Sequence, residues 1–138
     1  MRNTFDIVDI LYQVLQNNVG ITSAINGEIT KKRQINSDKE DVVIGSLPVT
    51  GEQIQQGIVN INIYVPNLTV KLNSIQDNSH PNHQRLKTLT ALVIEAVDEK
   101  YYSDYWFFVQ QQSLFESETG NEHYSNIRLE FYSENIKN

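Results

Sequence analysis

The stretch from Gly57 to Asn67, GIVNINIYVPN, constrains the fold more than any other part of the sequence. Successive side chains of a β-strand point to opposite faces of a sheet, so alternation of polarity predicts one buried face and one wetter face. Pro66 has no backbone N–H to donate and predicts the end of the strand. The alternation comprises apolar Val59, Ile61, Ile63 and Val65, with Asn60, Asn62 and Tyr64 between them.

The remaining chain predicts two main helices and four further strands. Apolar residues at helical spacing predict one helix from Thr4, its expected N-cap, to residue 16. A second is expected to begin at Pro81, capped by Ser79 or His80, and to run to about residue 97. Residues 21–25 suggest a short extra turn. Strands are expected at 27–33, 41–49, 104–116 and 123–133, beside the strand at 57–65.

This order, α-β-β-β-α-β-β, predicts an α+β fold. We expect a single domain over residues 1–138, with a largely antiparallel or mixed sheet of four to five strands packed by two main helices. The acid pairs Glu40–Asp41 and Asp98–Glu99 are interpreted as solvated ends of elements, and Arg85 is expected to face outward.

Charge and composition argue against several classes of function. The net charge is −6, and Lys31, Lys32 and Arg33 form the basic cluster, interpreted as a solvated strand end, so we expect no specific DNA binding. The apolar runs fall short of the roughly 20 residues that span a bilayer. Asp6 and Asp9 interrupt the N-terminal apolar stretch, which is atypical of a signal peptide. We therefore expect an intracellular protein without a membrane partner.

The sequence offers little chemistry. It contains no cysteine, which removes thiol nucleophiles and cysteine-based zinc sites. His80 and His83 are three residues apart, not the four of a zincin helix, and no third ligand is nearby. Phosphate-binding and nucleophile-elbow motifs do not occur. We expect no catalytic, metal-binding or cofactor-binding residues, and hence not an enzyme.

Two segments are candidates for contact with partners. Aromatic residues crowd 101–108, with Tyr105 and Trp106 as the candidates for contact, and the neighbours Trp106 and Phe107 must face opposite sides of a strand. Either the sheet is covered on both faces, or part of this cluster meets a partner, which we favour. In the polar stretch 66–80, Leu68, Val70 and Leu72 alternate as in a strand. This stretch is either an arm that adds to a neighbouring subunit or a loop folded back on its own domain.

Three segments together carry a resemblance to a known family: SDKEDVVIGSLPVTGEQIQQGIVNINIYVPN, NHQRLKTLTALVIEA and NEHYSNIRLEFYSEN. Their order resembles the tail terminator (tail completion, head–tail joining) proteins of phages and prophages, of the lambda U type. The resemblance implies a homo-oligomeric ring, commonly of six subunits, that caps the head-proximal end of the tail tube. Its partners would be the tail tube protein and the head–tail connector protein.

A ring interface joins two different patches of identical subunits. In such a ring Asn60, Asn62 and Tyr64 suit subunit contact or a wet lumen, and the segment after Pro66 suits an arm. We expect assembly in the host cytoplasm and a final place in the virion tail, where DNA passes without binding. Alternatives are a neck adaptor, tube or baseplate component, or a small cytoplasmic ligand-binding or enzymatic domain.

Overall fold

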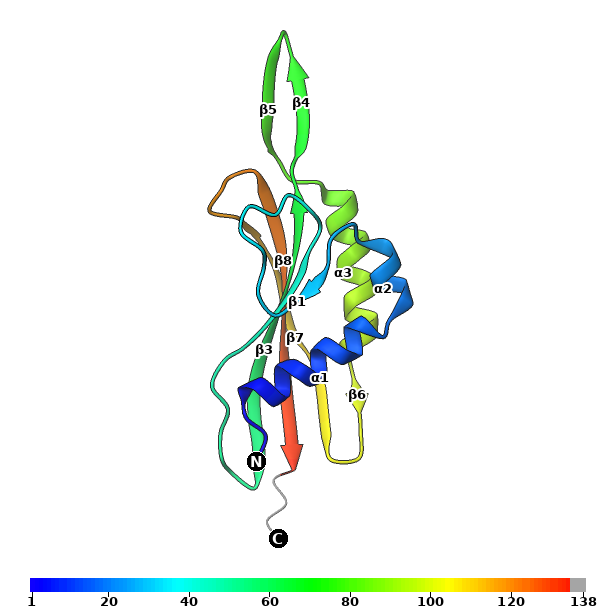
Figure 1. Ribbon diagram of the computed structural model, residues 1–138, viewed down its shortest axis with the longest axis vertical. Coiled ribbons are helices and arrows are strands. Elements are labelled where there is room, and N and C mark those ends of the chain that lie inside the picture. The colour runs from blue at the N-terminus through cyan, green and yellow to red at the C-terminus, as the bar shows by residue number, and fades with distance from the viewer. Residues whose placement is uncertain (135–138) are drawn as a thin grey trace.

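The computed structural model describes residues 1–134, which form an α+β fold with three helices, a curled six-stranded sheet and a separate two-stranded hairpin (Figure 1). The helices are α1 (Thr4–Gln16), α2 (Val19–Ala24) and α3 (His83–Val97). The strands are β1 (Ile29–Thr30), β2 (Val42–Ser46), β3 (Ile54–Pro66), β4 (Leu68–Leu72), β5 (Ile75–His80), β6 (Lys100–Tyr101), β7 (Tyr105–Glu116) and β8 (Glu122–Glu134).

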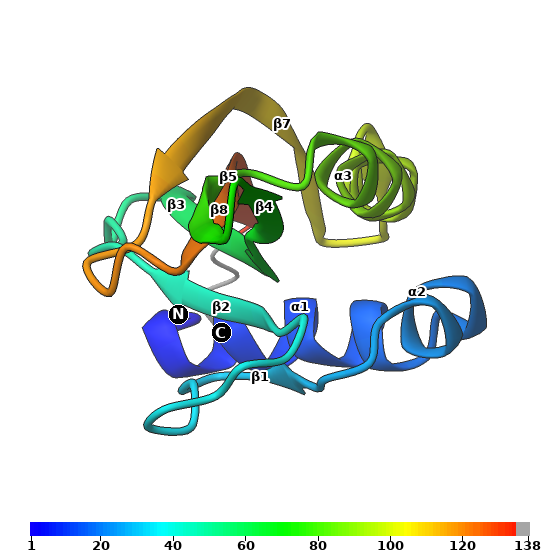
Figure 2. The ribbon, with the colours of Figure 1, turned by 90° about the horizontal axis from the view of Figure 1, so that it is seen from above.

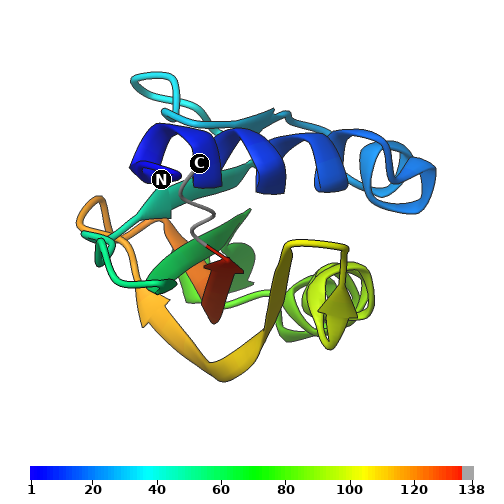
Figure 3. The same cartoon turned by 90° about the horizontal axis from the view of Figure 1, so that it is seen from below.

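The large sheet is built around two long strands. Its order is β1-β2-β3-β8-β7-β6, and each neighbouring pair is antiparallel except β1 with β2. The ladder between β3 and β8 is continuous from Ile54 opposite Glu134 to Pro66 opposite Glu122. The sheet curls so that β2 and β7 lie on either side of this central pair (Figures 2 and 3).

The predicted alternation of β3 is confirmed. Val59, Ile61, Ile63 and Val65 are at most 1% exposed, because α1 and α3 both pack on that face of the sheet. The helices contribute Ile7, Leu11 and Leu15 from α1 and Leu86, Leu89, Val93 and Val97 from α3. β7 and β8 complete the core with Phe107, Ile127, Leu129 and Phe131.

The helix ends differ slightly from the expectation. The N-cap of α1 is Asn3 instead of Thr4, and it forms a capping box with Asp6. The N-cap of α3 is Asn82, so this helix begins at His83 instead of Pro81. In both cases an asparagine oxygen accepts from a backbone N–H of the first turn, which a proline or histidine start cannot arrange as well.

Several expectations about strands are wrong. The large sheet has six strands instead of four to five, because the two-residue strand β6 was not recognised. The segment 27–33 forms a strand only at Ile29–Thr30, and β3 begins three residues before Gly57. The segment 66–80 is not a loop folded back on its own domain. It is the β4–β5 hairpin, which projects from one end of the molecule (Figure 1).

The expectation that the acid pairs are solvated holds for Glu99, which is exposed, and is wrong for Glu40 and Asp41. Glu40 and Asp41 are 6% and 3% exposed. Glu40 pairs with Arg85, whose Nε lies 2.6 Å from Oε2, so Arg85 turns toward this carboxylate instead of facing outward. Asp98, after α3, accepts a hydrogen bond from the Val109 N–H over 2.9 Å, which offsets its unfavourable place at a helix C-terminus.

Candidate functional site

The face of the large sheet that points away from α1 and α3, here called the uncovered face, carries the polar residues of β3. Asn126 on β8 donates to the side-chain oxygens of Asn62, over 2.6 Å, and Asn60, over 3.3 Å. These three residues are half-buried, although no helix covers them. The result is a fixed row of amides that crosses two strands.

Aromatic pairs flank the amides at both ends. Tyr64 and Tyr124 lie opposite each other with ring centroids 4.9 Å apart, and Phe115 of β7 stacks on Tyr124 at 5.5 Å. Toward the other end, Trp106 and Phe108 stack on Tyr132 of β8 at 5.8 and 5.7 Å. Aromatic residues are enriched at protein interfaces, and Tyr and Trp suit surfaces that are partly wet.

Tyr105 and Trp106, predicted together as interface residues, lie on opposite faces. Trp106 belongs to the uncovered face. Tyr105 packs against the core, with its ring 5.9 Å from Phe131 and 4.7 Å from Tyr102. An interface on the uncovered face would therefore include Trp106 and leave Tyr105 to a different surface.

Arg33 closes the Tyr64 end of the uncovered face. Its guanidinium lies 4.1 Å from the Tyr64 ring, pairs with Asp41 at 3.0 Å and also pairs with Glu122. It donates further to the carbonyl oxygens of Ser37 and Lys39, which ties the connection between β1 and β2 to the sheet. We call Arg33, Asp41, Glu122 and Tyr64 the Arg33 cluster.

The pKa directions in the Arg33 cluster follow from burial and pairing. Burial raises the pKa of Asp41, but the Ser37 hydroxyl, the Glu28 N–H and Arg33 outweigh it, and the net pKa lies below the ordinary value. Burial lowers the pKa of Arg33, but Glu122 and Asp41 raise it above its ordinary value. Burial, and then Tyr124, raise the pKa of Tyr64. Arg33 and Asp41 therefore stay ionised at neutral pH.

The basic triplet is consequently not a free cationic patch. Arg33 is held inside the cluster, and Lys31 pairs with Asp9 while its Nζ lies 5.2 Å from the Tyr12 ring. Of these three basic residues, Lys32 alone has no ion pair within residues 1–134, and its side chain is exposed. The interpretation as a solvated strand end missed these long-range carboxylate partners.

The β4–β5 hairpin is the second candidate surface. Leu72 and Ile75 lie opposite each other beside the turn and are each 70% exposed, while Leu68 is 44% exposed and Val70 is half-buried. Asn73 and Ser74 form the turn with φ of 51° and 68°. Asn67 anchors the base, since its side chain donates to the Asn78 and Gly120 carbonyls. The apolar side of the hairpin faces solvent.

Metal binding gains no support from the histidines. His80 pairs with Asp77 over 3.1 Å, and His83 is exposed on α3. Residues 1–134 contain no group of three or more histidine and acidic side chains placed to hold a metal ion. No helix within that range has the length and apolar character needed to cross a membrane.

Comparison with solved structures shows the fold. A chain from the "virion of native gene transfer agent (GTA) particle" superposes with a TM-score of 0.61, over 91% of this chain and 92% of that chain. The two sequences are 8% identical. No protein-family model matches the chain. No curated protein sequence matches it either.

Proposed function

We propose that this protein is a structural component of a phage-like virion that forms a ring at the head-proximal end of the tail tube. There it would end tube polymerisation and join the tail to the head connector. The observation that carries the proposal is the fold similarity, over 91% of this chain, to a chain of a virion particle. The resemblance to tail terminators narrows the position to the tail end and implies a closed cyclic ring of about six subunits.

The surfaces of the chain support assembly more than catalysis. The uncovered face presents Asn60, Asn62, Tyr64 and Trp106, and the hairpin presents Leu72 and Ile75 to solvent. A heterologous interface needs two different patches on each subunit, and the hairpin can supply one of them. Leu68 and Val70 would extend the hairpin patch toward its base.

The charge of the chain suits a ring through which DNA passes. A net charge of −6 per subunit adds over the ring. Two of the three residues of the basic triplet are already paired with carboxylates of the same chain. Because affinity for duplex DNA grows with the number of phosphates neutralised, such a ring would leave DNA mobile. The protein would assemble in the host cytoplasm and remain in the virion tail.

Tube growth in the presence of the protein tests this function. The tail tube protein of the same phage-like particle is polymerised with and without it, and tubes are imaged by negative-stain electron microscopy. We expect shorter tubes with a ring at one end. Tubes that grow unchanged would contradict the proposal, and so would a chain that stays monomeric in their presence. Binding to the head connector alone would indicate a neck adaptor, and binding to the distal end would indicate a baseplate component.

A further inference from the structure

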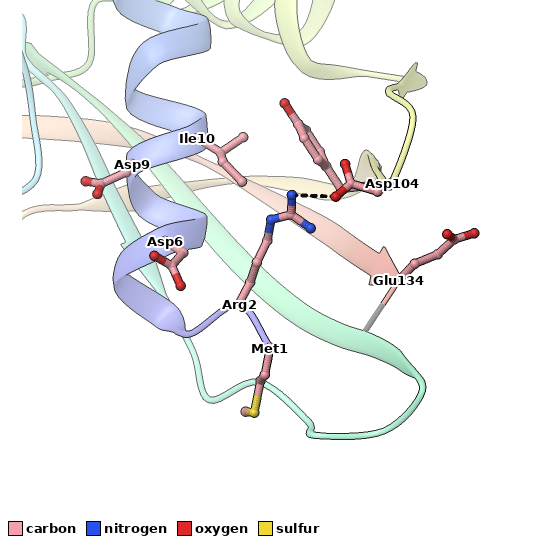
Figure 4. Close-up of a pocket in the computed structure, with 8 residues that line it drawn as sticks. Met1, Arg2, Asp6, Asp9, Ile10, Asp104 and Glu134 are labelled. Carbon is pink, nitrogen blue, oxygen red and sulfur yellow. Dashed lines mark hydrogen bonds and ion pairs between the residues drawn. The ribbon is translucent and has the colours of Figure 1, made fainter. Parts of the chain in front are cut away.

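A groove runs between α1 and the turn that joins β6 to β7. Two adjoining hollows of about 560 and 610 Å³ form it and share Asp9, Ile10 and Tyr105. Figure 4 shows the first hollow, with Arg2 extending from the N-terminal segment toward Asp104 across the space between the helix and the strands.

One end of the groove is acidic. It is lined by the carboxylates of Asp6, Asp9, Asp104 and Glu134. Arg2 pairs with Asp104 at 2.8 Å and lies 4.9 Å from the Tyr105 ring, and Lys31 pairs with Asp9. Within residues 1–134 no cation pairs with the other two carboxylates. This end therefore favours an additional positive charge.

The other end of the groove is apolar. Ile10 and Val14 of α1 form one wall, and Tyr102, 44% exposed and stacked on Tyr105, forms the other. An apolar slot beside two carboxylates that have no cation partner within residues 1–134 fits a segment that carries both bulky apolar side chains and a cation.

The tip of the β4–β5 hairpin has this combination. Leu72 and Ile75 point to one side of it, and Lys71, which is opposite Gln76, points to the other. The hairpin and the groove lie at opposite ends of the molecule (Figure 1), so a chain does not fill its own groove. The hairpin of another copy can reach the groove.

We infer that the groove between α1 and the β6–β7 turn receives the hairpin tip of a second copy of this chain. Leu72 and Ile75 pack on Ile10 and Val14 of α1, while Lys71, on the other side of the tip, faces Glu134 at the acidic end. The inference rests on the proposed ring and supplies its subunit contact. Because each copy offers one hairpin and one groove, the contact is heterologous and closes into a ring when the rotation between subunits permits.

Disulfide trapping tests the contact, and the natural absence of cysteine makes it unambiguous. Ile75→Cys and Gln13→Cys, the latter at an exposed residue of the groove, are prepared as separate proteins and mixed under mild oxidation. We expect mixed disulfide dimers, and a ladder that ends at the ring size when both substitutions are in one chain. Ile35→Cys, at a site 88% exposed, replaces Ile75→Cys in the control. Trapping that is no better than with this control overturns the inference.

Electron microscopy of the same mixtures separates the two claims. Rings that form while the Ile75→Cys and Gln13→Cys variants stay unlinked overturn the hairpin contact and leave the ring function standing. Absence of rings and of tube capping counts against the proposed function itself.

A charge exchange provides the second test. Lys71→Glu and Glu134→Lys are each expected to weaken association by about tenfold, because each places like charges opposite each other. The double variant restores the attraction and should recover most of the affinity. Lys32→Glu, a matched change away from the groove, should leave association unchanged. If the loss of affinity in the double variant equals the sum of the losses in the two single variants, the placement of Lys71 is contradicted.

Discussion

The β3–β8 pair and the β4–β5 hairpin are both antiparallel ladders with one apolar side, and they differ in what lies on that side. Helices α1 and α3 cover the apolar side of β3–β8, where Ile61 and Leu129 are 0% exposed. Solvent faces the apolar side of the hairpin, where Leu72 and Ile75 are each 70% exposed. The same local pattern therefore supports folding in one region and remains available to a partner in the other.

The difference also separates stability from assembly. A two-stranded hairpin alone is marginally stable in water, whereas strands packed under helices gain the free energy of burial. The body of the domain should fold without the hairpin, and the hairpin should become rigid when a partner covers it. Substitutions on the two sides of this division should therefore have different effects.

The largest difference in the free energy of unfolding should appear between an isoleucine of the body and an isoleucine of the hairpin. Ile61→Ala leaves a cavity in the core and should lower the free energy of unfolding by about 4 kcal/mol. Ile75→Ala, the matched change in the hairpin, should alter it by no more than about 0.5 kcal/mol. Chemical denaturation followed by circular dichroism measures both. Similar losses at the two sites would show that the hairpin belongs to the cooperative core.

Arg33→Met should give the next largest effect. The side chains of Asp41 and Glu122 are 4% and 8% exposed, and the substitution leaves both carboxylates without their cation. We expect a loss of about 3 kcal/mol, since breaking a buried ion pair leaves an uncompensated charge. Lys32→Met, the exposed neighbour, is the control and should change stability by less than about 0.5 kcal/mol. Equal effects would contradict the Arg33 cluster.

Acid should lower the stability of the folded body, because Asp41 becomes protonated. A carboxyl whose pKa is lower in the folded state stabilises that state above its unfolded pKa, and this stabilisation is lost as pH falls through the folded pKa. The ordinary value is 3.8, so the loss should begin near pH 4 and continue below it. Asp41→Asn should be less stable at pH 7 and show a shallower decline in acid. A wild-type melting temperature that is unchanged between about pH 5 and pH 2 would exclude this linkage.

The uncovered face can be blocked without disturbing the core. A Cβ added at Gly45 on β2 meets no atom within 4 Å, and Gly45 pairs with Asn60 in the ladder. Gly45→Arg should therefore change stability by less than about 1 kcal/mol while obstructing any partner on this face. Gly45→Ala is the small control. Normal tube capping by the arginine variant would exclude the uncovered face from the subunit and tube contacts.

The smallest effect should come from the hairpin turn. Asn73 and Ser74 both have positive φ, and Asn-Gly is the preferred sequence for such a two-residue turn. Ser74→Gly should slow hydrogen exchange of the β4–β5 amides by a few fold and leave the melting temperature of the body unchanged. A change in melting temperature of several degrees would show that the hairpin and the body unfold together.

Local pattern was sufficient for part of this structure. The alternation of Val59 to Val65 predicted both faces of β3, because a buried strand next to helices follows period two closely. The alternation of Leu68, Val70 and Leu72 indicated a strand. The turn after it was missed because Asn73-Ser74 lacks the glycine that signals such turns. The hairpin partner β5, with Gln76, Asp77, Asn78 and Ser79, is too polar to be recognised as a strand.

Long-range partners account for the other misses. Glu40 is 45 residues from Arg85, and Arg33 is 89 residues from Glu122. Short-range spacing in the sequence therefore predicts neither ion pair. Trp106 and Phe107 were expected to face opposite sides, but which side the helices cover depends on the register of β7 with β8. The residues of the candidate site could therefore be predicted from the sequence. Their division between two separate surfaces could not, because it depends on the three-dimensional fold.

Removal of the hairpin tests the division between body and arm most directly. Leu68 and His80 are paired at its base, so a two-residue Asn-Gly link can replace residues 69–79. Sedimentation velocity with and without tail tubes would then be compared with the wild type, after circular dichroism and thermal melting confirm the fold. We expect a folded chain with a near-normal melting temperature that no longer forms rings or caps tubes. A variant that still assembles, or one that no longer folds, would contradict this division of roles.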